Sequence, residues 1–272
     1  MLLCTFILIF LLHSTVLAEE VLKIGGTGTA LGSMQLLAKA FEKSHPGMKV
    51  RVILPSLGTS GGIKAISKDI IGIALSTRLV KDDEQNLGLS SMEYAKTPFI
   101  LATPKAVNIS SLSSDEIVKI YRGETVAWPN GERIRLILRP ATDTDTLLIK
   151  KISPEMSNAV DRALSRQGML IAMTDQDCAD MIEKTPGGFS FSTLTQVLSE
   201  KRQLKIISFN GVTPSIKTLA DGSYPLSKSL IMVTKKEPSS LVRKFIDFVR
   251  SKEGVEILEE TGNLSILGKT NP

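Results

Sequence analysis

Three loops of this sequence bring small hydroxyl side chains together with glycine at points where a strand gives way to a helix. They are 26–30 (Gly-Thr-Gly-Thr-Ala), 57–62 (Leu-Gly-Thr-Ser-Gly-Gly) and 139–146 (Arg-Pro-Ala-Thr-Asp-Thr-Asp-Thr). The first turn of a helix has free backbone N–H groups and a partial positive charge, and glycine lets an anion approach them closely. Together the three loops, one of them headed by Arg139, indicate an oxyanion site, although each loop alone is more typical of an ordinary helix cap or turn.

Two of these loops come close to nucleotide-binding motifs without matching them. The dinucleotide fingerprint G-x-G-x-x-G would need a glycine at position 31, where the sequence has Leu31, and the glycine follows one residue late as Gly32. The P-loop pattern needs a lysine directly after its last glycine, whereas Ile63 separates Gly62 from Lys64. Neither nucleotide-binding motif is therefore present.

The residues that metal and nucleophile chemistry favours are scarce. The chain has two His and two Cys, and one of each lies within residues 1–18, so that a chain without this segment keeps only His45 and Cys178. This argues against His-built zinc sites, most His-based triads and an internal disulfide, and we expect no metal and no cofactor. Asp143 and Asp145 could form a carboxylate pair for acid–base work, as in a phosphatase, but acidic residues in a first helical turn are also favourable to the helix dipole. We expect binding rather than catalysis.

The elements that would position the three loops alternate between strand and helix. Strands are predicted at 21–24, 50–54, 70–75, 99–102, 135–138, 206–209 and 229–234, and helices at 31–43, 63–67, 114–121, 157–165, 175–183, 193–199, 241–250 and 254–261. In the first helix the apolar residues recur at three- and four-residue spacing, which predicts one buried stripe (Leu31, Met34, Leu37, Ala38, Phe41). Strands alternating with helices predict an α/β fold with largely parallel sheets.

Length and charge limit the remaining classes of function. The chain has 272 residues, of which 42% are hydrophobic and 22% charged, an ordinary globular composition. At roughly 150 residues per domain, this length suggests about two domains. The net charge of +5 is mild, the basic residues are scattered and aromatic residues make up only 5% of the chain. No nucleic-acid partner is therefore expected, whereas a small anionic ligand is compatible with the charge.

The N-terminus has the pattern of a secretory signal. Residues 2–12 form an unbroken apolar run of 11 residues, which is too short for a membrane span of roughly 20 residues but suits a signal h-region. Val16 and Ala18 occupy the −3 and −1 positions of a cleavage site, and charged residues begin at Glu19. Because the segment has no Lys or Arg, a buried N-terminal strand or helix is the alternative. We expect cleavage after Ala18, a periplasmic location and a soluble mature chain without a transmembrane segment.

Several stretches carry a resemblance to one family. They are 26–29, 58–66 (Gly-Thr-Ser-Gly-Gly-Ile-Lys-Ala-Ile), 73–78 (Ile-Ala-Leu-Ser-Thr-Arg), 187–189, 211–215, 222–227 (Gly-Ser-Tyr-Pro-Leu-Ser) and 245–254. Over most of 21–265 the chain resembles the phosphate-binding proteins that serve ABC-type phosphate importers, within the type 2 periplasmic solute-binding proteins.

The resemblance implies a two-lobed α/β fold, in which each lobe is a mostly parallel sheet flanked by helices and a two-stranded hinge joins the lobes. It divides the chain into a signal peptide (1–18), a first lobe (19–102 and 225–272) and a second lobe (103–224). The implied function is capture of phosphate or a related oxyanion for the permease of an ABC importer, by a monomer that closes on its ligand. A sensor or accessory protein of the same fold, binding another ligand or partner, is the alternative.

The resemblance also implies the ligand-binding residues, which come from four segments of the chain. They are Gly28, Thr29 and Ala30; Thr59, Ser60 and Gly61; Ser76 and Thr77; and Arg139, Asp143, Thr144 and Asp145. The family usually has an Asp at position 76, which accepts the proton of a protonated phosphate and so excludes sulfate, and Ser-Gly-Thr at 143–145. One of the two carboxylates at 143–145 could replace the missing acceptor; otherwise the site holds a different ligand or has lost binding.

Overall fold

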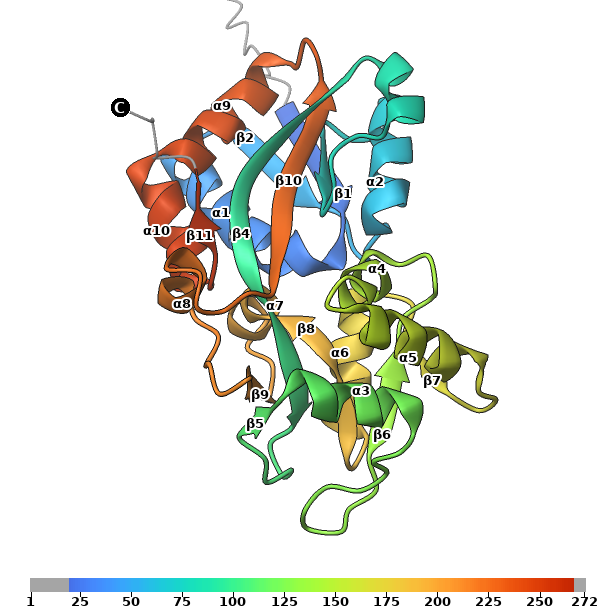
Figure 1. The fold of residues 1–272 in the computed structure, drawn as a ribbon. Helices are drawn as coiled ribbons and strands as arrows, with labels where there is room; N and C mark the ends of the chain where they lie inside the picture. The colour runs from blue at the N-terminus through green and yellow to red at the C-terminus, as the bar shows by residue number, and fades with distance from the viewer. Residues whose placement is uncertain (1–19, 267–272) are drawn as a thin grey trace, which may run out of the picture.

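Residues 20–266 are described by the computed structural model, and they form two α/β lobes, one above the other in Figure 1. This is the two-lobed arrangement that the resemblance implies. The predicted signal peptide, with its cleavage after Ala18, lies outside the described residues. Within 20–266, no helix is both long enough and apolar enough to cross a membrane.

The first lobe is built on a sheet with the strand order β2-β1-β3-β10-β4. Its strands are β1 (Glu20–Gly26), β2 (Met48–Val52), β3 (Ile73–Ser76), β10 (Ser227–Lys235) and the first part of β4 (Leu89–Pro104). Its helices are α1 (Leu31–Ser44), α2 (Gly58–Ser67), α9 (Ser240–Arg250) and α10 (Lys252–Glu260). Ile73 and Leu75 pack on the side of α1, α9 and α10, whereas Ala74 packs on the side of α2, because successive residues of a strand point to opposite faces.

The second lobe continues this sheet from the last residues of β4. Its strands are β5 (Ser111–Leu112), β6 (Arg135–Leu138), β7 (Leu170–Ile171), β8 (Gly188–Thr193) and β9 (Leu204–Phe209). Its helices are α3 (Ser114–Arg122), α4 (Thr144–Lys150), α5 (Pro154–Ser165), α6 (Asp175–Lys184), α7 (Leu194–Ser199) and α8 (Ile216–Ala220). Leu136 and Leu138 of β6 pack with residues of α3 and α5, whereas Ile137 packs with residues of α6 and α7 on the opposite face. Both faces of the sheet are therefore covered.

The sheets are mixed. Parallel pairs are β1–β2, β1–β3, β5–β9, β6–β7 and β6–β8. The antiparallel pairs between named strands all involve β4 or β10, including the short β11 (Leu264–Ser265) on β4. Parallel pairing comes from strand–helix–strand units inside each lobe, whereas β4 and β10 run in opposite directions at the junction of the lobes (Figure 1).

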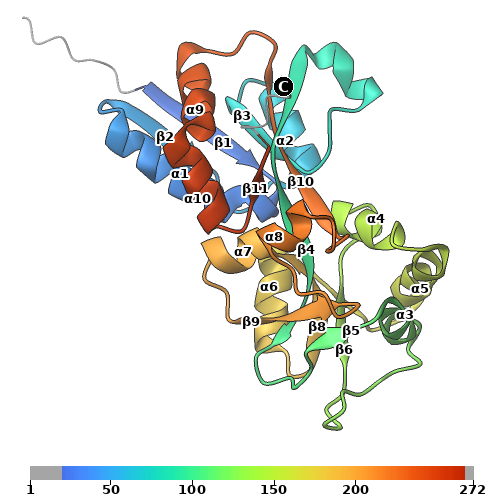
Figure 2. The ribbon, with the colours of Figure 1, turned by 60° about the vertical axis from the view of Figure 1, so that its left-hand side comes forward.

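The junction between the lobes consists of β4 and the chain that leads into β10. β4 pairs with β10 as far as Pro98 and with β8 from Phe99 onward. On the returning segment, the Leu226 carbonyl accepts the N–H of Phe99 at 3.0 Å, and the Tyr224 hydroxyl donates to the Phe99 carbonyl at 2.8 Å. Figure 2 shows these two segments passing side by side between the lobes. The exchange of partners falls a few residues before the predicted boundary at position 102, and the lobe bounds themselves stay a prediction.

Candidate ligand-binding site

The first predicted loop lies at the contact between the lobes. β1 ends at Gly26, and the short 3₁₀ helix η1 (Gly28–Ala30) follows directly before α1. Thr29 is fully buried, and its hydroxyl donates to Oδ1 of Asp175 in the second lobe at 2.9 Å. A Cβ atom on Gly28 would lie only 2.6 Å from Oδ2 of the same carboxylate, so glycine is what allows this close approach. The buried Ala30 completes the turn into α1.

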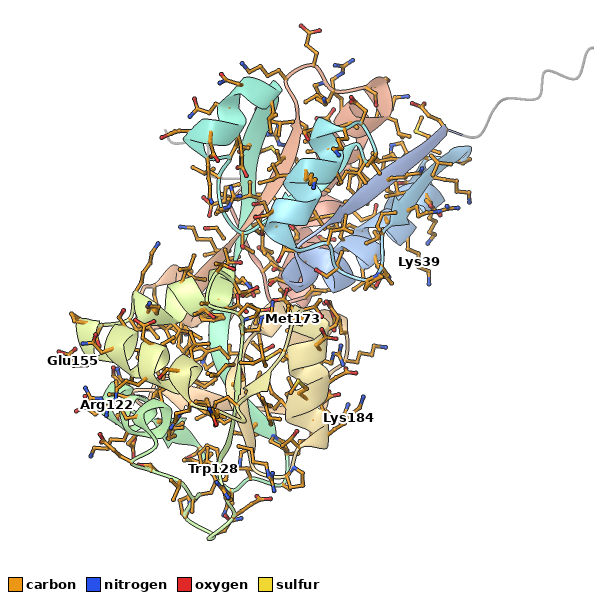
Figure 3. The ribbon with its side chains drawn as sticks, turned by 90° about the vertical axis from the view of Figure 1, so that its right-hand side faces the viewer. Lys39, Arg122, Trp128, Glu155, Met173 and Lys184 are labelled. Carbon is orange, nitrogen blue, oxygen red and sulfur yellow. The ribbon has the colours of Figure 1, made fainter. Side chains whose placement is uncertain are left out.

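The third loop places Arg139 and Asp143 at the start of α4. Arg139 follows β6 and is only 6% exposed. Its guanidinium donates to Oδ2 of Asp143 at 2.8 Å and to the Ala172 carbonyl at 3.3 Å. Asp143 is also the N-cap of α4, because its Oδ1 accepts the N–H of Asp145 at 2.9 Å. Figure 3 shows Met173, which follows that carbonyl, at the level where the lobes meet.

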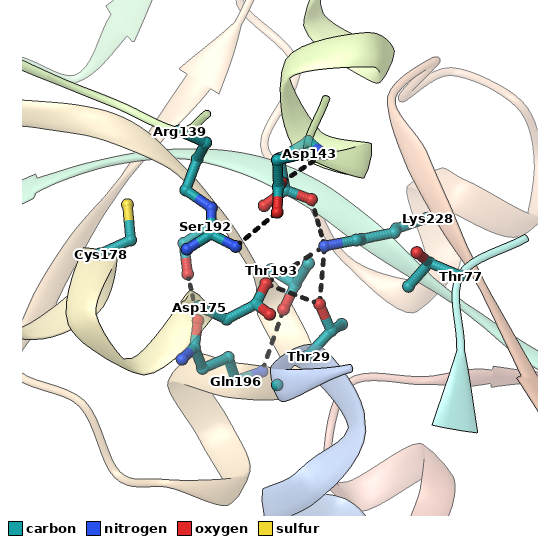
Figure 4. A network of polar contacts seen from close by, with 12 residues as sticks. Thr29, Thr77, Arg139, Asp143, Asp175, Cys178, Ser192, Thr193, Gln196 and Lys228 are labelled. Carbon is teal, nitrogen blue, oxygen red and sulfur yellow. Dashed lines mark hydrogen bonds and ion pairs between the residues drawn. The ribbon is translucent and has the colours of Figure 1, made fainter. Parts of the chain in front are cut away.

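Lys228 completes the site, although the sequence did not indicate it. This side chain comes from β10 and is only 1% exposed. Its ammonium group donates to the Thr29 hydroxyl at 2.7 Å and lies 3.2 Å from Oδ1 of Asp175. It also forms an ion pair with Asp145. Figure 4 shows Lys228 reaching into the centre of this polar network from the side opposite Arg139.

Asp175 is the second residue that the prediction missed. It is the first residue of α6, whose N-cap Thr174 accepts the N–H of Asp177 at 3.0 Å in a capping box. The neighbouring Gln176 donates to the Gly28 carbonyl at 3.0 Å. The predicted helix at 175–183 already contained this signal, since it is one more helix start with an acidic residue in its first turn. Lys228 had no comparable signal, because a lysine near a strand end is usually exposed.

The second predicted loop lies in the first lobe. Thr59 is buried in the first turn of α2, and its hydroxyl lies 3.3 Å from the hydroxyl of Thr77 and accepts the Thr77 N–H at 3.2 Å. The Ser76 hydroxyl is used within its own turn, where it donates to the Arg78 carbonyl at 2.5 Å. Ser60 is exposed. The first and third loops thus join one network through Asp175 and Lys228, whereas these hydroxyls are bonded within the first lobe.

The remaining two predicted residues, Gly61 and Thr144, lie on helices of different lobes. Gly61 is half-buried in α2, and a Cβ atom there would lie 3.3 Å from Cβ of Leu57. Thr144 is the half-buried first residue of α4, directly after its cap. Both residues therefore lie in the first turns of helices, where backbone N–H groups are free to donate.

The five charged side chains of the network carry a net charge of −1, from Arg139 and Lys228 against Asp143, Asp145 and Asp175. Burial raises the pKa of Asp145 to about 6, although the charge of Lys228 opposes this. Burial also acts to raise the pKa of Asp175, but Lys228, Arg139 and the Thr29 hydroxyl bring it down to about 2. The carboxylates in turn raise the pKa of Lys228 despite its burial. The two lysine-bound carboxylates therefore differ, with Asp175 held as the stable anion.

The described residues offer little for metal or nucleophile chemistry. Between 20 and 266, no group of three or more His, Cys, Asp or Glu side chains is arranged to hold a metal ion. Cys178 is buried, and burial raises the pKa of its thiol to about 12. A thiol with this pKa is almost fully protonated near neutral pH and is a poor nucleophile.

Two α/β lobes with a charged site between them are the architecture of the two-lobed binding-protein fold. A family model described as a PBP superfamily domain matches residues 14–253. The chain therefore belongs to this superfamily, the periplasmic binding proteins, and its fold is of type 2.

Individual relatives extend over nearly the whole chain. The chain is 26% identical to the phosphate-binding protein PstS of Borreliella burgdorferi, over 96% of this chain and 98% of that protein. It is 23% identical to PstS of Bacillus subtilis, over 87% of this chain and 77% of that protein. A phosphate ABC transporter substrate-binding protein from Clostridium perfringens, solved with bound phosphate, superposes with a TM-score of 0.76 at 20% identity, covering 91% of this chain and 100% of that one.

Proposed function

We propose that this chain is an exported solute-binding protein that captures phosphate, or a similar oxyanion, and presents it to the permease of an ABC importer. It binds as a monomer, breaks no bond and needs no cofactor. Relatives named as phosphate-binding proteins over nearly the full chain support this function. So does the solved structure of a phosphate-bound protein with the same fold.

The observation that carries the proposal is the position of Arg139. Its guanidinium is buried at the start of α4, in a network that reaches across to Thr29 of the first lobe through Asp175. Within the described part of the chain, nothing accepts a hydrogen bond from its Nε atom. The free Nε–H can donate to one oxygen of an oxyanion, and the planar guanidinium can meet two oxygens at once where the anion shares or displaces the bond to Asp143.

The carboxylates of the site favour an oxyanion that carries a proton. Asp143 and Asp145 replace neutral residues of the family pattern, and with Asp175 they make the network anionic. A protonated phosphate can donate a hydrogen bond to a carboxylate such as that of Asp145, whereas sulfate, which has no proton at neutral pH, would be repelled. Phosphate is therefore the ligand we propose in preference to sulfate.

Isothermal titration calorimetry on the chain from Glu19 onward tests the proposal directly. We expect saturable binding of phosphate and much weaker binding of sulfate, with molybdate and tungstate as larger oxyanions for comparison. Arg139→Met should abolish the binding, while Lys39→Met, an exposed position on α1 (Figure 3), serves as the matched control. Absence of any heat change with all four anions would reject the proposed function.

Export is a separate part of the proposal. It rests on the apolar run at 2–12 and the small residues Val16 and Ala18 that follow it. The full chain can be expressed in a bacterium that has a periplasm. N-terminal sequencing of the protein from the periplasmic fraction should then give a chain that begins at Glu19. Recovery of the protein only in the cytoplasm, with its first residues intact, would contradict export.

A further inference from the structure

Lys228 connects the two lobes through charge. It lies on β10 opposite Thr97 of β4, in the first-lobe part of the sheet and directly after the junction. Both of its acidic partners belong to the second lobe, where Asp145 lies in the first turn of α4 and Asp175 in the first turn of α6. The two ion pairs therefore cross from one lobe to the other.

Three side-chain oxygens surround the ammonium group of Lys228. An ammonium has three donors, and Lys228 faces three acceptors, which are the Thr29 hydroxyl and one carboxylate oxygen each from Asp145 and Asp175. The exposed fractions are 1% for the Lys228 side chain, 6% for that of Asp145 and 10% for that of Asp175. An unpaired charge in such a buried place is strongly unfavourable. Separation of the lobes breaks both ion pairs, and the separated charges then have to be solvated by water.

Neutral contacts beside these charges hold the same surfaces together. Gln176 of α6 donates to the backbone carbonyl of Gly28 at 3.0 Å. A Cβ atom at Gly32 of α1 would lie 2.9 Å from Cγ of Glu200, just beyond α7, so these segments are already at close packing distance. Nearer the junction, Asn263 donates to the hydroxyl of Thr195 at 2.9 Å. The charged contact thus lies within a packed interface between the lobes.

We propose that Lys228, Asp145 and Asp175 form an interlobe latch, in which the chain's own charges hold the two lobes closed without help from a bound anion. In this scheme closure is a property of the protein, and ligand entry requires the latch to open. The latch goes beyond the proposed function, because it holds whichever solute the site binds. Of the two carboxylates, Asp175 makes the larger contribution to the latch, since it accepts hydrogen bonds from both Lys228 and Thr29.

Interlobe distance in phosphate-free protein tests the latch. Spin labels attached to cysteines at Lys64 on α2 and Leu147 on α4 report this distance, because both positions are exposed and lie on different lobes. The native Cys178 is buried and is not expected to react. We expect one short-distance population in the otherwise unchanged protein, with or without phosphate, and a second, longer population in Lys228→Met.

Two further variants keep the result interpretable. The triple variant Lys228→Met, Asp145→Asn, Asp175→Asn removes the latch without leaving a buried charge unpaired, so it should fold and should also show the longer distance. Lys235→Met, on the same strand, removes an ion pair with Asp69 inside the first lobe and should leave the distance unchanged. A long distance in the unchanged protein, or a short one in both Lys228 variants, would overturn the latch.

Phosphate titration of the same samples separates this inference from the proposed function. A short distance that depends on Lys228, in a protein that gives no heat with phosphate, supports the latch and rejects phosphate as the ligand. Phosphate binding in a protein whose lobes are apart until the anion is added supports the proposed function and overturns the latch.

Discussion

Asp143 pairs with Arg139 across 2.8 Å, while its second carboxylate oxygen caps α4 by accepting the N–H of Asp145 at 2.9 Å. One side chain therefore supplies the arginine with an internal anion at the helix start where an oxyanion is expected to bind. An incoming oxyanion has to share Arg139 with this carboxylate or displace it. Asp143 should thus limit the affinity that Arg139 gives to the site.

Asp143→Asn should raise the affinity for phosphate. Asparagine caps a helix as well as aspartate does, so α4 should be retained while the negative charge beside Arg139 is lost. A hydrogen bond to a charged group contributes roughly 1.5–3 kcal/mol, and releasing part of it to the ligand should improve binding by about tenfold. Calorimetric titration measures this, and sulfate should gain more than phosphate because repulsion by the carboxylate is removed.

The matched variant for this change is Asp143→Ala. It removes the charge and the cap together, and should lower the free energy of unfolding by about 1 kcal/mol relative to Asp143→Asn. Weaker phosphate binding in a well-folded Asp143→Asn protein would show that the carboxylate assists the anion instead of competing with it.

Arg139→Met should lose both ligand affinity and stability. The substitution leaves the half-buried Asp143 and the buried Asp145 and Asp175 with Lys228 as the only cation of the five-residue network. Breaking a buried pair by removing one partner typically costs about 3–5 kcal/mol, and a value near the lower end is expected because Asp143 is 20% exposed. Urea unfolding measures the loss of stability, and calorimetry should show at least a hundredfold loss of phosphate affinity.

The double variant Arg139→Met, Asp143→Asn separates these two effects. It removes the unpaired carboxylate, so most of the stability should return while phosphate binding stays lost. Recovery of phosphate binding in this double variant would mean that Arg139 does not bind the ligand.

The helix starts of the site could be predicted from sequence because they depend on local residue types. Glycine, threonine and aspartate near positions 28 and 143 have strong preferences for turns and caps, and those preferences act within a few residues. Contacts over long separations had no such signal. Thr29 and Asp175 are 146 positions apart, and Thr29 and Lys228 are 199 apart. Only folding of both lobes brings these side chains together.

The secondary structure, too, was predicted where local residue patterns determine it and missed where long-range pairing does. Helices with a clear apolar stripe, such as α9 (Ser240–Arg250), lie within a residue or two of the predicted 241–250. The strand β8 (Gly188–Thr193) was missed, because Gly-Phe-Ser-Phe-Ser-Thr places small polar residues on one side although all six are buried. Only 99–102 of β4 was predicted, because its earlier residues are polar enough to suggest a loop and are held as a strand by pairing with β10.

Gly28→Ala should disturb the contact between the lobes. A Cβ atom there would lie 2.6 Å from Oδ2 of Asp175, so either the carboxylate or η1 must shift. Overpacking of this kind costs typically 1–3 kcal/mol, and moving Asp175 would also weaken its bond with Thr29. Urea unfolding should show a loss in this range. Lys39→Ala, exposed on the adjacent α1, should change stability by less than about 0.5 kcal/mol, and equal effects of the two substitutions would contradict the tight contact.

The pH dependence of stability should carry opposite contributions from the two lysine-bound carboxylates. Burial raises the pKa of Asp145 to about 6, whereas Lys228 and Arg139 outweigh burial and lower that of Asp175 to about 2. An unfolded Asp has a pKa of about 3.9. Between pH 6 and about 4 the folded protein therefore binds more protons at Asp145 than the unfolded chain does, and this contribution to stability grows as the pH falls. The contribution of Asp175 is present above about pH 4 and is lost as the pH falls toward 2.

Comparison of the unchanged protein with Asp145→Asn and Asp175→Asn isolates these contributions from those of other carboxylates. Urea unfolding at pH 7, 5 and 3 should show that Asp145→Asn is most favourable relative to the unchanged protein at pH 7, where Asp145 is a buried anion. It should have lost part of that advantage at pH 5 and all of it at pH 3. Asp175→Asn should be most destabilising at pH 5 and above, and less so at pH 3, where the unchanged protein is itself losing this contribution. The Lys228 pairs lie between the lobes, so the interlobe distance should respond most to Asp175→Asn. If both substitutions changed stability equally at every pH, the two carboxylates would be equivalent, and the assignment of Asp175 as the stable anion beside Lys228 would be wrong.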